Sequence, residues 1–276
     1  MGTAISFTIN KGGVGKTTSL CAIAQILALG GYKVLIADLG QQSNASRIFG
    51  IREDLPNIAY KNLYCKLLTK EEMQEFIIPT SFENIDIIPS STQLIRMNDK
   101  IYDAKKENPA VVTNLKNNLQ QIKDDYDFIL IDNEPTIDNM LDCSIAASDK
   151  ILIPMNTDNL SYEGILNIIK LVEKINNTYN LQVKFGGIFI TRVKKRTTLY
   201  RDLSEGYTEQ FGDYFIPVAI RDCNAVAEAN TAFIPLYEYE KKCTAFIDYI
   251  ELISHLNIMD QKHYQNVIKK LSAKKI

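Results

Sequence analysis

The 276-residue sequence contains no tryptophan, only two histidines and five cysteines. The cysteines are odd in number and widely scattered, and none belongs to a C-x-x-C pair. This pattern favours free buried thiols over a disulfide framework or a cysteine-held metal or cluster. The histidines, His255 and His263, stand in no pattern of catalytic partners, so we expect both to lie at the surface.

The sequence also lacks a strong net charge and a long apolar run. Its formal net charge is −2, so the chain has no global attraction for DNA, and any nucleic-acid site must be a local patch. No apolar run reaches about 18 residues, which argues against a transmembrane helix. The first residues do not have the layout of a signal peptide, and we therefore expect a cytoplasmic protein.

A glycine-rich loop, residues 10–18, is the most informative stretch of the chain. It follows the apolar run 4–9 and precedes a helical pattern over 20–27. A strand, a glycine loop and a helix in this order predict a phosphate-binding loop, because backbone N–H groups and a helix N-terminus attract anions. Lys16 then pairs with the β- and γ-phosphates of a nucleotide, and the Thr17 hydroxyl ligates Mg²⁺. The predicted nucleotide-binding residues of the loop are Lys11, Gly12, Gly13, Val14, Gly15, Lys16, Thr17 and Thr18.

The loop departs from the ordinary pattern G-x-x-x-x-G-K-[ST], because Asn10 stands where the first glycine belongs and Lys11 adds a second lysine. It resembles the deviant Walker A motif, K-G-G-x-G-K-[ST]-T, of the ParA/MinD family of ATPases. In that family the first lysine reaches across a dimer interface to the partner's nucleotide. The resemblance implies that Lys11 and Lys16 both stabilise charge on the phosphates, within an ATP sandwich homodimer.

Two apolar strands end in carboxylates. Residues 33–38 end at Asp38 and residues 127–132, a Walker B strand, end at Asp132; both aspartates are predicted to hold water molecules of the Mg²⁺ shell. The sequence that begins at Asp38 resembles the ParA pattern D-L-D-P-Q-x-N. Gly40 stands in place of the aspartate that, in the family, orients or activates the attacking water. The resemblance therefore implies impaired hydrolysis. Glu134, which replaces a proline of the family's D-x-P-P, is the only nearby carboxylate in the motifs that can compensate.

Strand and helix patterns alternate along the chain and predict an α/β fold, a doubly wound, mostly parallel sheet with helices on both faces. We expect one P-loop ATPase domain over residues 1–256 and a basic tail or helix over 257–276. Short amphipathic helices are predicted over 60–68 and 71–77. The tail is either a basic amphipathic helix that lies on an anionic membrane, as in MinD, or a solvated chain end.

Later segments carry the predicted base and DNA contacts. The residues that frame the adenine base, by resemblance, are Arg192, Arg221 and Asp222; the alternative is that they belong to ordinary surface loops. The predicted DNA-binding residues are Lys194, Lys195, Arg196 and Arg201. Such a basic cluster suits contact with phosphates, although short basic runs are also common on solvated faces. ParA proteins bind DNA non-specifically with arginines in this region, so the resemblance favours DNA binding.

Together these features predict an ATP- and Mg²⁺-dependent DNA-partitioning ATPase that associates with the nucleoid. In this interpretation the ATP dimer binds non-specific DNA, and a ParB-like centromere-binding partner stimulates hydrolysis and release. Two alternatives stay open, a non-hydrolysing, ATP-locked binding module and a MinD-like membrane-associated ATPase. The match to ParA after Asp38 disfavours membrane binding.

Overall fold

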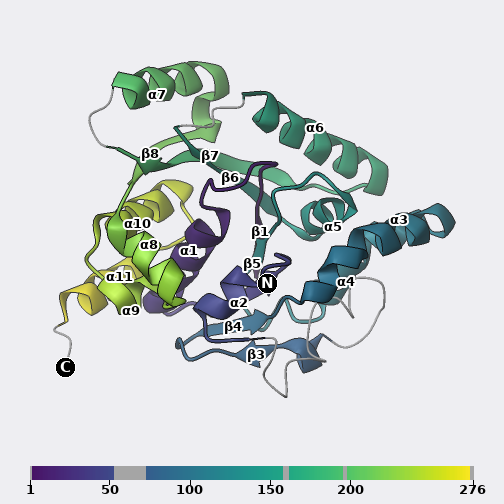
Figure 1. The fold of residues 1–276 in the computed structure, drawn as a ribbon, viewed down its shortest axis with the longest axis horizontal. Helices are drawn as coiled ribbons and strands as arrows, with labels where there is room; N and C mark the ends of the chain where they lie inside the picture. The colour runs from purple at the N-terminus through teal and green to yellow at the C-terminus, as the bar shows by residue number, and fades with distance from the viewer. Residues whose placement is uncertain (1, 53–72, 158–161, 195–197, 274–276) are drawn as a thin grey trace.

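The computed structural model describes residues 2–52, 73–157, 162–194 and 198–273, built around an eight-stranded sheet (Figure 1). The strand order is β3-β4-β2-β5-β1-β6-β7-β8, and all pairings are parallel except that of β3 with β4. The strands are β1 (Thr3–Phe7), β2 (Val34–Asp38), β3 (Ile78–Pro79), β4 (Ile85–Ile88), β5 (Phe128–Asp132), β6 (Lys150–Asn156), β7 (Lys184–Val193) and β8 (Phe215–Arg221). The predicted mostly parallel sheet is confirmed.

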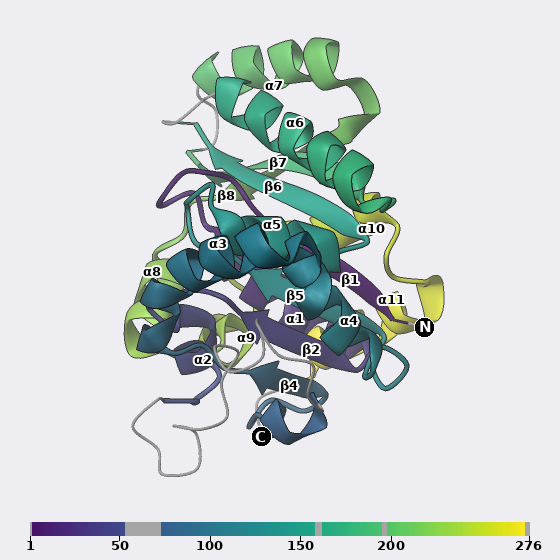
Figure 2. The ribbon, with the colours of Figure 1, turned by 90° about the vertical axis from the view of Figure 1, so that its right-hand side faces the viewer.

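Helices cover both faces of this sheet (Figures 1 and 2). They are α1 (Lys16–Gly30), α2 (Asn44–Ile48), α3 (Met97–Glu107), α4 (Asn114–Gln120), α5 (Asn139–Ala147), α6 (Tyr162–Tyr179), α7 (Thr198–Phe211), α8 (Asn224–Ala232), α9 (Leu236–Glu240), α10 (Thr244–Leu256) and α11 (Gln261–Ser272). Short 3-10 helices are η2 (Gln74–Phe76), η3 (Thr92–Arg96), η4 (Pro109–Thr113) and η5 (Gly212–Tyr214). One hydrophobic cluster joins the sheet to α3–α7, and the other joins it to α1, α2 and α8–α11.

Alternate residues of the strands enter the two cores, because successive side chains of a strand point to opposite faces. In β5, Ile129 and Ile131 belong to the cluster under α3–α7, whereas Phe128 and Leu130 belong to the cluster under α1. A central parallel strand buried on both faces is therefore a continuous apolar run. This explains why the sequence before Asp132 is apolar without alternation.

Helix α1 is buried along nearly its whole length, because α10 and α11 pack on the side that the sheet leaves open. In α11, Val267 and Leu271 are buried, and Asn266 Nδ2 donates to the carbonyl oxygen of Gly30 at 2.9 Å. The expectation of a solvated chain end is therefore wrong for α11. Val267 and Leu271, two of the apolar residues on which the membrane alternative depends, instead belong to the core around α1, whereas Ile268 is exposed.

The two short helices predicted over 60–68 and 71–77 are not confirmed. Within the described part of 71–77 the predicted helix is wrong, because only Gln74–Phe76 turn, as η2, and Ile77 is already extended. The helix predicted over 60–68 lies outside the described residues. In the part of the chain that the structure describes, no helix is both long enough and apolar enough to cross a membrane.

Candidate functional site

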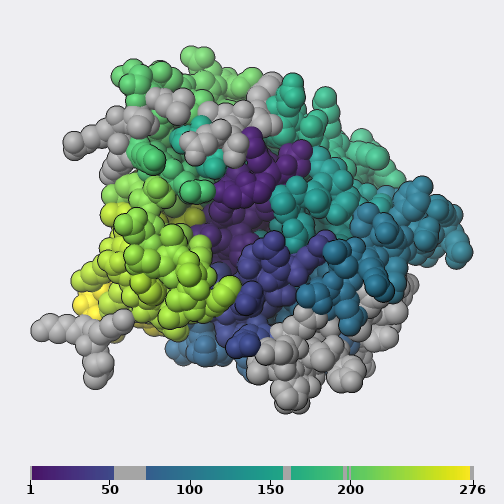
Figure 3. All heavy atoms as spheres, viewed as in Figure 1, coloured from purple at the N-terminus to yellow at the C-terminus, as the bar shows by residue number. Residues whose placement is uncertain are grey.

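The glycine loop joins β1 to α1 at the carboxyl edge of the sheet, beside the ends of β2 and β5. Gly13 (φ 73°) and Gly15 (φ 79°) are left-handed, a conformation in which a side chain would be strained. Gly15 is the N-cap of α1, so the unpaired N–H groups of the first helical turn face the loop. Figure 3 shows the purple N-terminal residues reaching the surface between the yellow-green C-terminal helices and the teal central segments.

Lys16 is the buried cation of this loop. The residue is 7% exposed, and its Nζ donates to the carbonyl oxygen of Lys11 at 2.8 Å. Burial lowers the pKa of Lys16, and the nearby carboxylates of Asp132 and Glu134 act in the opposite direction. An anion that enters the loop can therefore replace a backbone carbonyl as the partner of a partly desolvated ammonium group.

The two predicted Mg²⁺ carboxylates lie side by side, because Asp38 and Asp132 are register partners in the pairing of β2 with β5. Both are buried. Asp132 Oδ2 accepts from Thr17 Oγ1 at 2.6 Å. Asp38 Oδ2 accepts from Ser46 N at 2.8 Å and Ser46 Oγ at 2.7 Å, and its Oδ1 accepts from Gly40 N at 3.0 Å.

The electrostatics of this pair favour a cation. Burial raises the pKa of both carboxyl groups, and the charge of Asp38 adds to the rise in the pKa of Asp132. Asp132 Oδ1 is buried and has no hydrogen-bond partner among the described residues. No group of three or more His, Cys, Asp or Glu side chains in the described ranges is arranged to hold a metal by itself. The Thr17 hydroxyl and the two carboxylates are oxygen donors, which suit Mg²⁺, an ion that also keeps water molecules and takes phosphate oxygens as ligands.

Position 40 lies directly beside these carboxylates. A Cβ atom built on Gly40 would lie 3.2 Å from Asp38 Oδ1, 3.8 Å from Glu134 Oε1 and 4.0 Å from Asp132 Oδ2. Glu134 Oε1 accepts from Gln41 N at 2.5 Å, and Ser90 Oγ donates to the carbonyl oxygen of Gly40 at 2.5 Å. Glu134 and Ser90 thus hold the backbone after β2 from two sides. The Glu134 carboxylate lies within 4 Å of the position that a side chain on residue 40 would occupy.

These groups line a cleft of about 320 Å³. Its lining residues are Gly12, Gly13, Gly15, Lys16, Thr17, Thr18, Gly40, Gln42, Asn44, Asp132, Asn133, Glu134 and Pro135. The cleft brings together the predicted phosphate loop, the Walker B carboxylate and the loop after β2. These segments are far apart in the sequence and meet only at the edge of the sheet.

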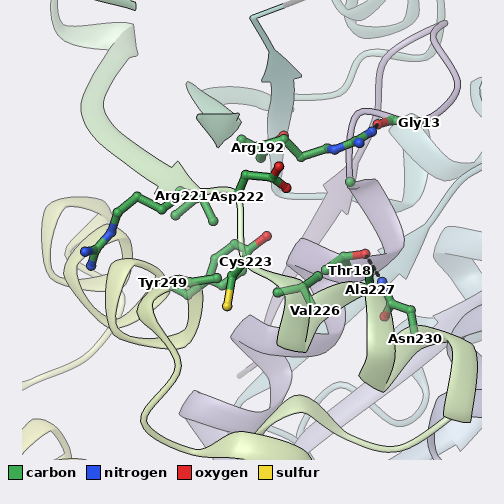
Figure 4. A pocket seen from close by; sticks show the side chains of 14 residues that line it. Gly13, Thr18, Arg192, Arg221, Asp222, Cys223, Val226, Ala227, Asn230 and Tyr249 are labelled. Carbon is green, nitrogen blue, oxygen red and sulfur yellow. Dashed lines mark hydrogen bonds between the residues drawn. The ribbon is translucent and has the colours of Figure 1, made fainter. Parts of the chain in front are cut away.

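A second pocket of about 280 Å³ shares Gly13, Gly15 and Thr18 with the cleft (Figure 4). Its apolar lining residues include Val226, Ala245 and Tyr249. The other lining residues are Thr191, Arg192, Ile220, Arg221, Asp222, Cys223, Ala227 and Asn230. A mostly apolar pocket next to a phosphate cleft suits the base and ribose of a nucleotide.

Arg192 and Arg221 differ in where their side chains point (Figure 4). Arg192 has a left-handed backbone (φ 55°), and its Nη1 donates to the carbonyl oxygen of Gly13 at 3.3 Å, so the side chain extends toward the loop. Arg221 turns away from the pocket. Its Nε lies 2.7 Å from Asp248 Oδ2 and its Nη2 lies 2.5 Å from Asp248 Oδ1. Asp222, the third predicted base contact, donates its backbone N–H to Val193 O at 3.0 Å on the pocket wall.

Some residues of the site were not predicted from the sequence. Asn230 Nδ2 donates to Thr18 Oγ1 at 3.0 Å, and the Tyr249 hydroxyl lies 2.9 Å from Ser19 Oγ, so α8 and α10 support the first turn of α1. Asp248, also on α10, instead holds Arg221 at the end of β8. These residues lie on helices whose sequence pattern is that of ordinary amphipathic helices, so only the topology brings them to the site.

The predicted DNA-binding cluster is only partly described. Lys195 and Arg196 lie outside the described residues. Lys194 is exposed just after β7, and Arg201 is exposed on α7, where its Nη2 lies 3.4 Å from Asp202 Oδ1. A surface ion pair of this length contributes little to stability, so the Arg201 side chain can change partners at small cost.

Comparisons with known proteins agree with this geometry. A family model described as an AAA domain matches residues 2–185. The chromosome-partitioning ATPase Soj of Treponema pallidum is 29% identical over 260 residues, which cover 94% of this chain and 99% of that protein.

Two solved structures resemble the fold. An ATP complex of McdA from Cyanothece has a TM-score of 0.79 at 17% identity and covers 94% of this chain and 98% of its own. A plasmid partition protein of Borrelia burgdorferi bound to AMPPNP has a TM-score of 0.70 at 24% identity and covers 92% of this chain and 100% of its own. The two structures support the fold. The family model and the Soj sequence support the assignment to a family.

Proposed function

The chain belongs to the AAA domain family and within it to the ParA-type partition ATPases, and on this premise we propose that it binds ATP with Mg²⁺ and partitions DNA. The observation that carries the proposal is the cleft in which Lys16, Thr17 and Asp132 converge at the carboxyl edge of the sheet. This edge is where open α/β sheets bind their ligands.

Each part of the nucleotide has a proposed place. The glycine loop and the first turn of α1 receive the phosphates, with Lys16 on the β- and γ-phosphates. Thr17 Oγ1 and water molecules on Asp38 and Asp132 hold Mg²⁺, which neutralises charge on the phosphates when bound. The base lies in the second pocket, against Val226 and Tyr249. In this proposal Arg221 contributes backbone to the pocket wall, and Arg192 contributes its side chain.

The proposal extends to assembly. ATP joins two copies into a homodimer, with Lys11 of each copy directed at the nucleotide of the other. The dimer binds non-specific DNA of the nucleoid through the cluster around Arg196, and a ParB-like partner stimulates release. Turnover is slow, because Gly40 lacks the side chain that the family pattern supplies at this position, and any turnover needs another group to orient water. The packing of α11 on α1 gives no support to a MinD-like membrane ATPase.

Two lysine variants test the proposal. Lys16→Ala removes charge-assisted hydrogen bonds worth about 1.5–3 kcal/mol each, so the Kd for ATP with Mg²⁺ should rise at least about tenfold. Lys11→Ala should bind ATP but elute as a monomer on a sizing column when ATP is present. Lys174→Ala, an exposed lysine on α6, is the matched control and should behave like the parent in both assays.

Each variant tests a different part of the proposal. ATP affinity that survives Lys16→Ala unchanged overturns the phosphate site. A Lys11→Ala protein that still dimerises on ATP overturns only the cross-interface role.

A further inference from the structure

Asp132 and Glu134 line the cleft, and Asp38 is buried beside Asp132; the two aspartates already hold fixed hydrogen bonds. Both oxygens of Asp38 accept hydrogen bonds, from Ser46 and from Gly40 N, and Asp132 accepts from Thr17 Oγ1. Both aspartates are buried at the bottom of the site. Neither can turn toward a water molecule above the phosphates without breaking these contacts.

Glu134 is different. It is only half-buried and lines the cleft, and it is close enough to Lys16 to influence the pKa of that ammonium group. The hydrogen bond that the described structure gives its side chain is the one from Gln41 N to Oε1. This single bond anchors the carboxylate at the wall of the cleft, and each carboxylate oxygen can accept more than one hydrogen bond.

The position of this carboxylate is informative. Its Oε1 lies 3.8 Å from the point where a Cβ of residue 40 would stand. A side chain that began at residue 40 would thus enter the same part of the cleft. The chain has no carboxylate on residue 40, and it has one that reaches the same place from the loop after β5.

From this geometry we propose that Glu134 orients the attacking water and is the residue on which the hydrolysis of ATP by this chain depends. The inference rests on the proposed function. In the step, the water oxygen bonds to the γ-phosphorus, and the bond to the β–γ bridging oxygen breaks with its electron pair left on ADP. Both water protons remain on the phosphate product until solvent takes one. Glu134 accepts a hydrogen bond from the water and holds it in line with the leaving oxygen.

The test compares Glu134→Gln with the parent in ATP turnover, with DNA present. Glutamine keeps the shape and the oxygen that accepts from Gln41 N, so a merely structural role survives the change. Loss of a water-orienting group typically lowers the rate about 10²–10⁴-fold, and we expect kcat to fall at least about tenfold with KM and ATP affinity unchanged. Glu134→Asp should retain more activity than Glu134→Gln.

A relocation experiment gives the second arm. Gly40→Asp in the Glu134→Gln background returns a carboxylate to the same part of the cleft and should restore turnover toward the parent level. Unchanged kcat in Glu134→Gln overturns the inference. So does a parent that binds ATP but hydrolyses it no faster than a protein-free solution, because the chain is then a locked module. Failure to bind ATP at all would instead refute the proposed function.

Discussion

The ion pair of Arg221 with Asp248 points to a structural role for this arginine in place of a nucleotide contact. The sequence resemblance assigns Arg221 to the nucleotide, whereas in the structure its guanidinium group contacts Asp248 on α10 and the carbonyl of Thr244 at 3.3 Å. Asp248 is only 5% exposed and also accepts from the backbone N–H of residue 221 at 2.9 Å. The pair therefore links the end of β8 to α10, and its loss should lower the free energy of unfolding.

The expected magnitude follows from burial. Breaking a buried ion pair by removing one partner costs about 3–5 kcal/mol. Water reaches part of this pair, because 23% of the Arg221 side chain is exposed, and Asp248 keeps one N–H donor in the variant. We therefore expect Arg221→Met to lower the free energy of unfolding by about 2–3 kcal/mol. With an m-value of about 2–3 kcal/mol/M, the midpoint of urea unfolding falls by roughly 1 M.

The assay is urea unfolding followed by circular dichroism, together with ATP titration well below the unfolding transition. Adding Asp248→Asn to Arg221→Met should recover about half of the lost stability or more, because the variant no longer buries an unpaired charge. ATP affinity of the folded Arg221→Met protein should stay within about threefold of the parent, or roughly 0.7 kcal/mol. An unchanged midpoint of urea unfolding with a tenfold weaker ATP affinity would refute the reasoning. It would indicate that Arg221 binds the nucleotide.

Two further predictions concern the chain end and the basic cluster. Val267→Ala removes two buried methyl groups from α11 and should lower the free energy of unfolding by about 2 kcal/mol in the same urea assay, whereas the exposed neighbour variant Ile268→Ala should change it by less than about 0.5 kcal/mol. Arg196→Ala should weaken DNA binding similarly for all sequences and flatten the logarithmic salt dependence by about one unit, as measured by titration at several salt concentrations; a sequence-selective loss would contradict a phosphate contact.

Much of this architecture is predictable because the central strands are buried on both faces. Buried parallel strands such as β5 appear as apolar runs that end in a carboxylate, and the glycine loop after β1 has a spacing that few other structures need. The long helix α6 (Tyr162–Tyr179) is likewise marked by apolar residues at helical spacing. Short elements carry less signal. The two-residue strand β3 and the five-residue helix α9 are too short for a periodic pattern to show.

The site was predictable where one segment supplies several groups and not where distant segments meet. The motifs identify Lys16, Thr17 and Asp132 as members of one site, and the structure brings them together. The orientation of Arg221 depends on Asp248, a partner 27 residues away on a helix with no motif. In the same way, the proximity of Glu134 to position 40 follows from the pairing of β2 with β5, which sequence spacing does not reveal.

The place of β1 in the sheet has a consequence for how the chain is made. This strand, residues Thr3–Phe7, is bordered by β5 and β6, so its neighbours end at Asp132 and Asn156. Ribosomes add about 5–20 residues per second, so roughly 6–30 s separate synthesis of the strand from that of its partners. During this interval the apolar strand and α1 lack the later strands and helices that cover them in the folded protein. The glycine loop cannot take its final shape before then, so ATP can stabilise only a chain whose first half has already been joined to its middle.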